Sequence, residues 1–224
     1  MACENDLKLS NGSLELLKWL AILLMTGDHV STFLFNGQLE ILNNMGRAAM
    51  PIFAFVFAYN LNRPHAHLAH KRTASRLLVF GLLATPFYVM LTDSSNWLPL
   101  NILFTLLAGM ICIITFQAKR YIELALLFLF IGLIVEYYWF GLALIILSFH
   151  FLKSKTTLSS FLLSSCLAFL FFINGNHYAL IALPVVIIFG NLKVSFPRFK
   201  WVFYIYYPVH LAVLLLIKTY LTYY

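Results

Sequence analysis

Charged side chains are scarce in this sequence, and their scarcity excludes an ordinary soluble protein. Only 10% of the 224 residues are charged, whereas soluble domains carry about 25%. The chain is instead 62% hydrophobic, with a mean hydropathy of +0.88. We therefore expect an all-α integral membrane protein, a polytopic transmembrane helix bundle. It should form one domain over residues 1–224, with no room for a separate soluble module.

Cysteine is also scarce, and no two cysteines have the spacing of a metal or redox motif. The three cysteines are Cys3, Cys112 and Cys166, and two of them lie within apolar segments. Neither a disulfide framework nor a zinc site is indicated, so we expect no metal. The net charge of +7 would suggest nucleic acid in a soluble protein. Here it indicates basic loops beside membrane lipid, is compatible with an anionic ligand, and predicts no nucleic acid.

Long apolar segments are what the sequence has in abundance. A membrane-spanning helix needs roughly 20 apolar residues, with a range of about 17–25. About nine candidate spans cover residues 14–35, 45–62, 75–92, 99–117, 121–135, 138–152, 158–173, 178–190 and 199–221. Several middle candidates are short, so two of them are open to being tilted, re-entrant or wrongly divided. The polar start and the long first apolar run are not typical of a cleaved signal peptide.

Basic residues are distributed over the connectors in an alternating pattern. Lysine and arginine gather in every second connector, while the connectors between them hold only acidic or polar residues. Because basic loops stay in the cytoplasm, this pattern predicts an N-terminus inside and a C-terminus outside. Only Arg47 and Lys218 fall elsewhere, and Lys218 can reach the interface from a helix end. The alternation favours nine spans.

The first apolar segment contains Asp28 and His29 side by side. An aspartate at the centre of a spanning helix costs roughly 2.5–3.5 kcal/mol on insertion scales, so it is rarely present without a role. Neighbours on a helix are about 100° apart, so Asp28 shares a face with Ser31, and His29 shares one with Thr26 and Phe33. We expect Asp28 to orient other groups and His29 to face a reaction cavity. The alternative is a packing histidine bonded to a neighbour.

Arg47 opens the second apolar segment and is the expected partner of Asp28. At about 1.5 Å per residue, Asp28 lies roughly 11 Å below the outer end of its helix and Arg47 about 4 Å below its own. An arginine side chain can cross that difference, so an intramembrane ion pair is predicted. Pro51, if inside the helix, would free the carbonyl of Arg47. The alternative is an interfacial arginine that extends to lipid headgroups.

Two later segments also carry polar side chains. Asn101 lies at the outer end of the fourth segment and shares a face with Thr105 and Gly109. Stripes of small and polar residues usually mean close helix packing, and contact with substrate is the other interpretation of Asn101. His210 lies near mid-membrane beside Pro208. An intramembrane histidine is a functional candidate, and the alternative is again a bonded packing histidine.

The first inside connector is dense in basic residues and histidines. The residues that we expect to bind a phosphate-bearing ligand are Arg63, His67, Lys71, Arg72 and Arg76. Arginine and lysine suit a polyphosphate, while a topology signal that faces anionic lipid fits these residues equally well. The connector is a weak metal site, because it offers no carboxylate or thiolate.

Several of these motifs, taken in order, resemble the TraX family of polytopic membrane proteins of conjugative plasmids. They are Leu17-Lys18-Trp19 with Met25, Asp28 and His29; Gly46-Arg47-Ala48 with Pro51; Arg76-Leu77; Asn101-Ile102-Leu103-Phe104; and Tyr207-Pro208-Val209-His210-Leu211. The match is dense over residues 14–116, thin from 120 to 195, and returns near the C-terminus. Their order and spacing together are more specific than any one of them.

The resemblance implies an N-acetyltransferase of the bacterial inner membrane that caps the amino terminus of a pilin subunit, with acetyl-CoA as donor. Such proteins are also similar to membrane acyltransferases with a catalytic intramembrane histidine, a role that maps onto His29. Asp28 and Arg47 would complete the catalytic set, Asn101 and His210 would contact substrate, and the basic connector would hold the CoA phosphates. The alternatives are a proton-coupled transporter and a non-enzymatic pilus-assembly factor. Against the transporter, the hydropathy shows no inverted repeat.

Overall fold

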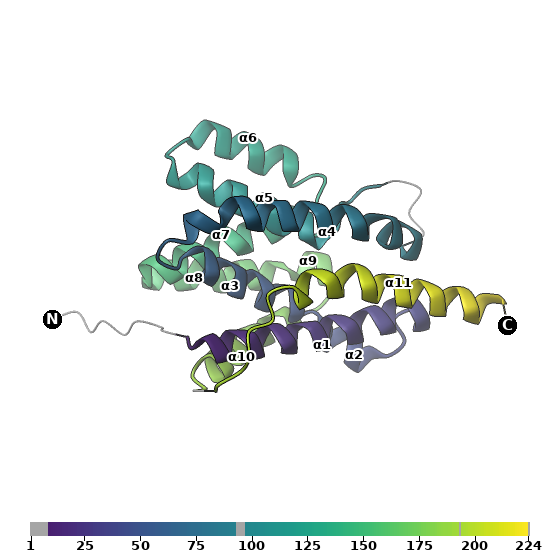
Figure 1. The fold of residues 1–224 in the computed structure, drawn as a ribbon. Coiled ribbons are helices and arrows are strands. Elements are labelled where there is room, and N and C mark those ends of the chain that lie inside the picture. The colour runs from purple at the N-terminus through teal and green to yellow at the C-terminus, as the bar shows by residue number, and fades with distance from the viewer. Residues whose placement is uncertain (1–8, 93–96, 193, 224) are drawn as a thin grey trace.

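The computed structural model describes residues 9–92, 97–192 and 194–223, and the regular secondary structure of this part of the chain is helical apart from one isolated bridge (Figure 1). The helices are α1 Asn11–Phe35, α2 Glu40–Gly46, α3 Ala49–Leu61, η1 Ala66–Ala69, α4 His70–Leu91, α5 Ile102–Gln117, α6 Tyr121–Ile131, α7 Tyr138–Ser154, α8 Thr157–Phe169, α9 Phe171–Asn174, η2 Tyr178–Ile181, α10 Ala182–Gly190 and α11 Val202–Tyr223. The predicted all-α class is confirmed.

The lengths of the helices indicate a multi-pass membrane protein. Within the described chain, four helical stretches are long and apolar enough to cross a membrane: Glu40–Leu61, Ala66–Leu91, Thr157–Asn174 and Val202–Thr222. The shorter apolar stretches are Ile102–Gln117, Tyr121–Ile131, Tyr138–Ser154 and Tyr178–Gly190. The nine predicted segments therefore coincide with helical stretches, but several of these are shorter than a full span.

The helices α5, α6 and α7 are short because they begin or end inside the bundle. Asn101, which caps α5, donates to the carbonyl of Gly81 at 3.0 Å, in the middle of α4. The connection after α6 pairs with the segment before α5, through Leu100 N–H to Ile134 O at 2.7 Å and Glu136 N–H to Leu100 O at 2.8 Å. Non-helical backbone at this depth requires such internal pairing. The connector that holds Glu136 therefore lies within the bundle rather than at its outer end, where the segment boundaries had placed it.

The first two segments form the expected antiparallel hairpin, with a shorter turn than predicted. Asn36 and Gly37 adopt positive φ angles of 51° and 78°, and α2 begins at Glu40. The second segment is not one helix over 45–62, because it is interrupted at Arg47 between α2 and α3. Pro51 consequently lies in the first turn of α3, where a helix does not need its N–H group.

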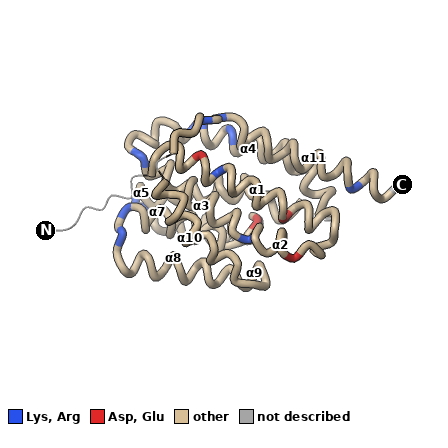
Figure 2. Tube along the Cα trace, turned by 90° about the horizontal axis from the view of Figure 1, so that it is seen from below, with Lys and Arg blue, Asp and Glu red and all other residues tan. Residues whose placement is uncertain are grey.

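Charge separates along the long axis of the bundle. Lysine and arginine gather at the end where the chain begins, as the tube view shows (Figure 2). Lys218 lies towards the opposite end, where its Nζ donates to the carbonyl of Leu91 at 3.2 Å, at the C-terminal end of α4. This arrangement has the asymmetry that the positive-inside rule describes.

A candidate active site between the first and last helices

His29 and His210, from the first and last long helices, form a hydrogen-bonded pair. Nδ1 of His29 lies 2.8 Å from Nε2 of His210, although the residues are 181 positions apart. The two rings are nearly parallel, with centroids 5.0 Å apart and an interplanar angle of 12°. The side chain of His210 is buried in the contact between α1 and α11. Two intramembrane histidines that the sequence analysis treated separately thus belong to one site.

The neighbouring backbone determines which nitrogen atoms of the pair carry protons. Nδ1 of His210 lies 3.1 Å from the carbonyl oxygen of Tyr206, and a carbonyl can only accept a hydrogen bond. His210 Nδ1 is therefore the protonated nitrogen, and Nε2 of the neutral ring carries a lone pair. His29 Nδ1 must donate to that lone pair, so its own lone pair is on Nε2. The pair thus prepares His29 Nε2 to act as a base or a nucleophile.

Aromatic and hydroxyl contacts hold the two rings in place. The ring of Tyr206 stacks on His210, with centroids 5.1 Å apart, and its hydroxyl lies 2.7 Å from Thr26 Oγ1. Phe33 packs against His29 at a centroid distance of 5.3 Å. Thr26, His29 and Phe33 lie on one face of α1, as the helical spacing predicted, and this face packs against α11.

The predicted ion pair between Asp28 and Arg47 is present. Arg47 Nη2 lies 3.4 Å from Asp28 Oδ1 and donates to Asn43 Oδ1 at 2.7 Å. Because α2 begins at Glu40, Arg47 lies about 10 Å below the outer end of that hairpin arm, rather than the expected 4 Å. It is thus almost level with Asp28, and its side chain need not extend along the bundle to meet the carboxylate.

Gly46 allows α2 to approach α1 closely beside this ion pair. A Cβ atom built on Gly46 would lie 2.3 Å from Cβ of Asp28 and 3.1 Å from the carbonyl oxygen of Leu24. Contacts this short force the backbone to move. The absence of a side chain at Gly46 therefore sets the distance at which Asp28 and Arg47 meet.

Glu136 and Tyr137 extend the polar cluster, although the sequence analysis assigned them no role in the site. The Tyr137 side chain lies within reach of the Arg47 guanidinium, and Glu136 interacts electrostatically with Asp28 and Arg47. Glu136 Oε2 is buried and has no hydrogen-bond partner among the described residues. One signal was available in the sequence: an acidic residue between two apolar segments that were both short for a span.

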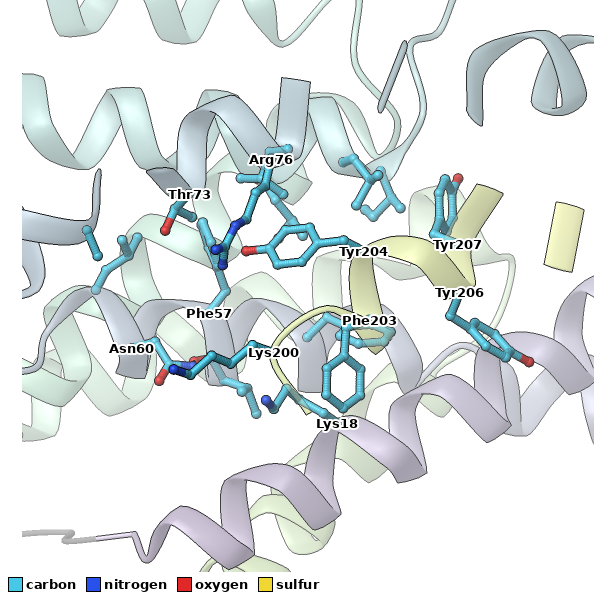
Figure 3. A pocket seen from close by; sticks show the side chains of 18 of the residues that line it. Lys18, Phe57, Asn60, Thr73, Arg76, Lys200, Phe203, Tyr204, Tyr206 and Tyr207 are labelled. Carbon is cyan, nitrogen blue, oxygen red and sulfur yellow. The ribbon is translucent and has the colours of Figure 1, made fainter. Parts of the chain in front are cut away.

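A cavity of about 460 Å³ leads from the basic end of the bundle towards the histidine pair. Its basic lining residues are Lys18, His70, Arg72, Arg76, Arg198 and Lys200. Figure 3 shows Lys18, Arg76 and Lys200 in this lining, with Tyr206 and Tyr207 farther along α11. Both tyrosines contact His210, since their ring centroids lie 5.1 and 5.4 Å from its ring. The cavity thus joins a cationic mouth to the aromatic wall of the histidine site.

The cavity includes two of the five predicted phosphate-binding residues. Arg72 and Arg76 line it, and the guanidinium of Arg76 lies 4.2 Å from the ring centroid of Trp201, a cation–π contact that orients it. Three others are not among the lining residues: Arg63, His67 and Lys71. Arg63 instead donates to Asn11 Oδ1 at 2.8 Å.

Three of the basic lining residues were missed because they come from other segments. Lys18 belongs to α1, whereas Arg198 and Lys200 precede α11. Only the packing of α11 against both α1 and α4 brings them to the mouth, so spacing along the sequence did not indicate them. Across the described residues, no three His, Cys, Asp or Glu side chains come together in the manner of a metal site.

The amide of Asn101 is engaged with α4 rather than with this cluster. Its Nδ2 donates to the carbonyl of Gly81 at 3.0 Å and to Thr85 Oγ1 at 3.1 Å, while its Oδ1 accepts from Leu103 N–H at 3.2 Å. The residue is fully buried. Both ends of its amide are therefore engaged within the protein, in agreement with the helix-packing interpretation.

Comparison with known proteins supplies the context of this site. The sequence profile described as TraX protein matches residues 13–218. An uncharacterized protein of Rickettsia prowazekii is 30% identical over 103 residues, covering 46% of this chain and 37% of that protein. Protein TraX of Escherichia coli is 35% identical over 95 residues, covering 42% of this chain and 36% of that protein. In both relatives, the aligned part is little more than a third of the whole protein.

A third relative aligns along almost its full length. The probable fimbrial assembly protein FimC, serogroup H1, of Dichelobacter nodosus is 25% identical over an alignment of 236 positions, covering 92% of this chain and 95% of that protein. No solved structure matches the chain. Because the TraX profile extends over nearly the whole sequence, from the first helix to the last, the chain belongs to the TraX family.

Proposed function

We propose that this chain is a membrane-embedded acetyltransferase that moves an acetyl group from acetyl-CoA to the N-terminal amine of a pilin subunit. It would cross the bacterial inner membrane several times, with its N-terminus in the cytoplasm and its C-terminus outside. Membership of the TraX family supports the reaction. The observation that carries the proposal is the cavity, which has cations at its mouth and the His29–His210 pair behind its aromatic end.

The cavity suits a donor with phosphates at one end and a reactive group on a long arm. Arginine and lysine at the mouth bind phosphate through charge-assisted hydrogen bonds. Lys18 at the mouth and His29 are about 16 Å apart along α1. A nucleotide held at the mouth therefore reaches the histidine only through an extended arm, such as the pantetheine arm of CoA.

His29 Nε2 is the proposed general base. Acetyl-CoA supplies an acetyl group already activated as a thioester. The acceptor ammonium loses one proton to His29 Nε2, and the free amine attacks the thioester carbonyl as the carbon–sulfur bond breaks. Two protons leave the acceptor nitrogen overall: one ends on the departing sulfur, and the other is released. The variant mechanism places the acetyl group on His29 Nε2 first, and labelled acetyl retained on the protein without acceptor would identify it.

Arg47 is the proposed donor to the oxyanion that forms during acyl transfer. Its Nε is buried and has no hydrogen-bond partner among the described residues, so this N–H is available to a reacting oxygen. A fixed donor in a water-poor site stabilises developing negative charge efficiently. Asp28 and Asn43, which contact the Nη2 atom of the same guanidinium, would hold it in position.

The intact mass of mature pilin tests the proposal. Pilin from cells that produce this chain should be heavier by one acetyl group, about 42 Da, than pilin from cells that lack it. The His29→Ala variant, produced at the same membrane level, should return the lower mass. Identical pilin masses with and without the wild-type chain would contradict the proposal and favour a non-enzymatic assembly role.

A further inference from the structure

Three buried polar atoms of one cluster lack hydrogen-bond partners within the described part of the chain. They are Asp28 Oδ1, Arg47 Nε and Glu136 Oε2, and they come from α1, the α2–α3 junction and the turn before α7. Buried polar groups are nearly always hydrogen-bonded, so each exception calls for an explanation. Asp28 Oδ1 lies 3.4 Å from Arg47 Nη2 in the ion pair, so Arg47 Nε and Glu136 Oε2 are the two atoms whose contacts a ligand would complete.

Glu136 is held rigidly in this site by its backbone. Its N–H donates to Leu100 O at 2.8 Å, and its carbonyl accepts from Thr105 Oγ1 at 2.8 Å. The following residue, Tyr137, has a φ of 63°, an uncommon conformation for a bulky side chain that persists only where the surroundings enforce it. The carboxylate is thus presented inside the bundle by a fixed turn.

The formal charges of the cluster favour a cationic ligand. Two carboxylates, Asp28 and Glu136, face the single guanidinium of Arg47, and Asp28 already forms the ion pair with it. With both carboxylates ionised, the excess is one negative charge, on the side of Glu136, whose carboxylate receives a hydrogen bond from the backbone of Ile102. A buried carboxylate requires a counter-ion or several hydrogen-bond donors. A primary ammonium group provides both, whereas a hydroxyl group provides one neutral donor.

The cluster lies next to the histidine pair, beside the inner end of the basic cavity, where Tyr207 is a lining residue. Asp28 precedes His29 in α1, and Tyr207 connects the two groups because it contacts His210 and interacts electrostatically with Glu136. The basic cavity is lined by none of the three charged residues of the cluster. A ligand at Glu136 would therefore bind beside the inner end of the donor cavity, far from its cationic mouth.

We infer that Glu136 is the acceptor-binding residue, whose carboxylate holds the protonated primary amine beside His29. This inference rests on the proposed function and specifies the acceptor as a cationic primary amine rather than an alcohol. The ammonium pairs with Glu136 and then passes one proton to His29 Nε2, after which the neutral nitrogen attacks. The amide product carries no charge, so it loses its attraction to Glu136 and leaves the site.

The variant Glu136→Gln tests this role, because it keeps the shape of the side chain and removes its charge. The KM for a synthetic peptide with the mature pilin N-terminus should rise roughly 30-fold or more, while the KM for acetyl-CoA stays unchanged. Glu136→Asp keeps the charge, and its KM for the peptide should lie between those of the wild type and Glu136→Gln. Glu40→Gln, the same change on an exposed residue of α2, is the matched control and should behave as wild type. An unchanged peptide KM in Glu136→Gln would overturn the inference.

A second test uses the wild-type protein, so it does not depend on how the variants fold. The Kd of the pilin peptide should be roughly 30-fold lower than that of the same peptide with a hydroxyl group in place of its amine. Equal Kd values, with pilin acetylation intact, would refute the assignment of Glu136 and leave the proposed function standing. Amine-selective binding without any acetylation would support the cation site and refute the proposed function.

Discussion

His29 Nδ1 lies 2.8 Å from His210 Nε2, and the carbonyl of Tyr206 fixes the direction of that hydrogen bond. His210 therefore plays the part that a carboxylate or carbonyl plays beside many catalytic histidines: it accepts the Nδ1 proton and leaves Nε2 free. A neutral hydrogen-bond acceptor such as His210 suits a site within apolar helices, where an additional charge would be costly.

Removing the side chain of His210, which accepts the hydrogen bond from His29 Nδ1, should impair His29 as a base without affecting the binding of acetyl-CoA. We expect His210→Ala to lower kcat roughly 10- to 100-fold, because His29 loses the partner that fixes its tautomer and orientation. The KM for acetyl-CoA should stay near its wild-type value. His210→Gln can still present an oxygen to His29 Nδ1 and should restore part of the rate. Steady-state kinetics in detergent measures both constants, and an equal loss in both variants would argue against the orienting role.

Closing the space at Gly46 should displace the ion pair. In Gly46→Ala, the new Cβ would lie 2.3 Å from Cβ of Asp28, and overpacking of this kind typically costs about 1–3 kcal/mol. We expect a lower melting temperature and a lower kcat, because Arg47 moves away from Asp28.

Gly27→Ala is the matched control for the Gly46 variant. The atoms nearest to its Cβ would belong to the side chain of Leu42, the first at 3.3 Å, and alanine is favoured over glycine in a helix by about 1 kcal/mol. This variant should be as stable as wild type or more stable. If the two glycine variants melt alike, the proposed steric role of Gly46 is wrong.

The KM for acetyl-CoA should respond differently to arginine variants inside and outside the lining of the basic cavity. Arg76→Ala removes a guanidinium from the cavity lining and should raise the KM for acetyl-CoA roughly 10- to 100-fold. Arg63→Ala, on the same connector but outside the lining, should change that KM little. A donor KM that rises equally in both variants would instead indicate a diffuse basic surface.

The parts of this site that could be predicted from the sequence are those formed by a single hairpin, that of the first two apolar segments. Hydropathy and helix periodicity were sufficient to pair Asp28 with Arg47 and to place His29 on the face of Thr26 and Phe33, because these residues are close along the chain. Even there, the predicted depth of Arg47 was wrong, because the polar residues from Glu40 onwards form the helix α2 and so lengthen this arm of the hairpin.

The remaining features depend on contacts between distant segments, which periodicity does not encode. The His29–His210 pair joins the first and last helices, and the cavity brings Lys18 of α1 and Lys200, which precedes α11, together with the arginines of α4. Glu136 was placed in an outer connector because a charged residue between apolar runs usually lies in one. The backbone pairing with Leu100 lets it remain inside, and that pairing has no local signature.

A single variant, Asn101→Ala, tests whether Asn101 serves helix packing or contacts the substrate. Asn101→Ala removes two hydrogen bonds to α4 and the cap of α5, which leaves the buried N–H of Leu103 without its acceptor. Each lost hydrogen bond costs about 0.5–1.5 kcal/mol, and loss of the cap costs about 0.5–2 kcal/mol. We therefore expect a clear fall in melting temperature, with kcat and both KM values per folded molecule unchanged. A protein of wild-type stability with a raised KM for the pilin peptide would instead assign Asn101 to the substrate.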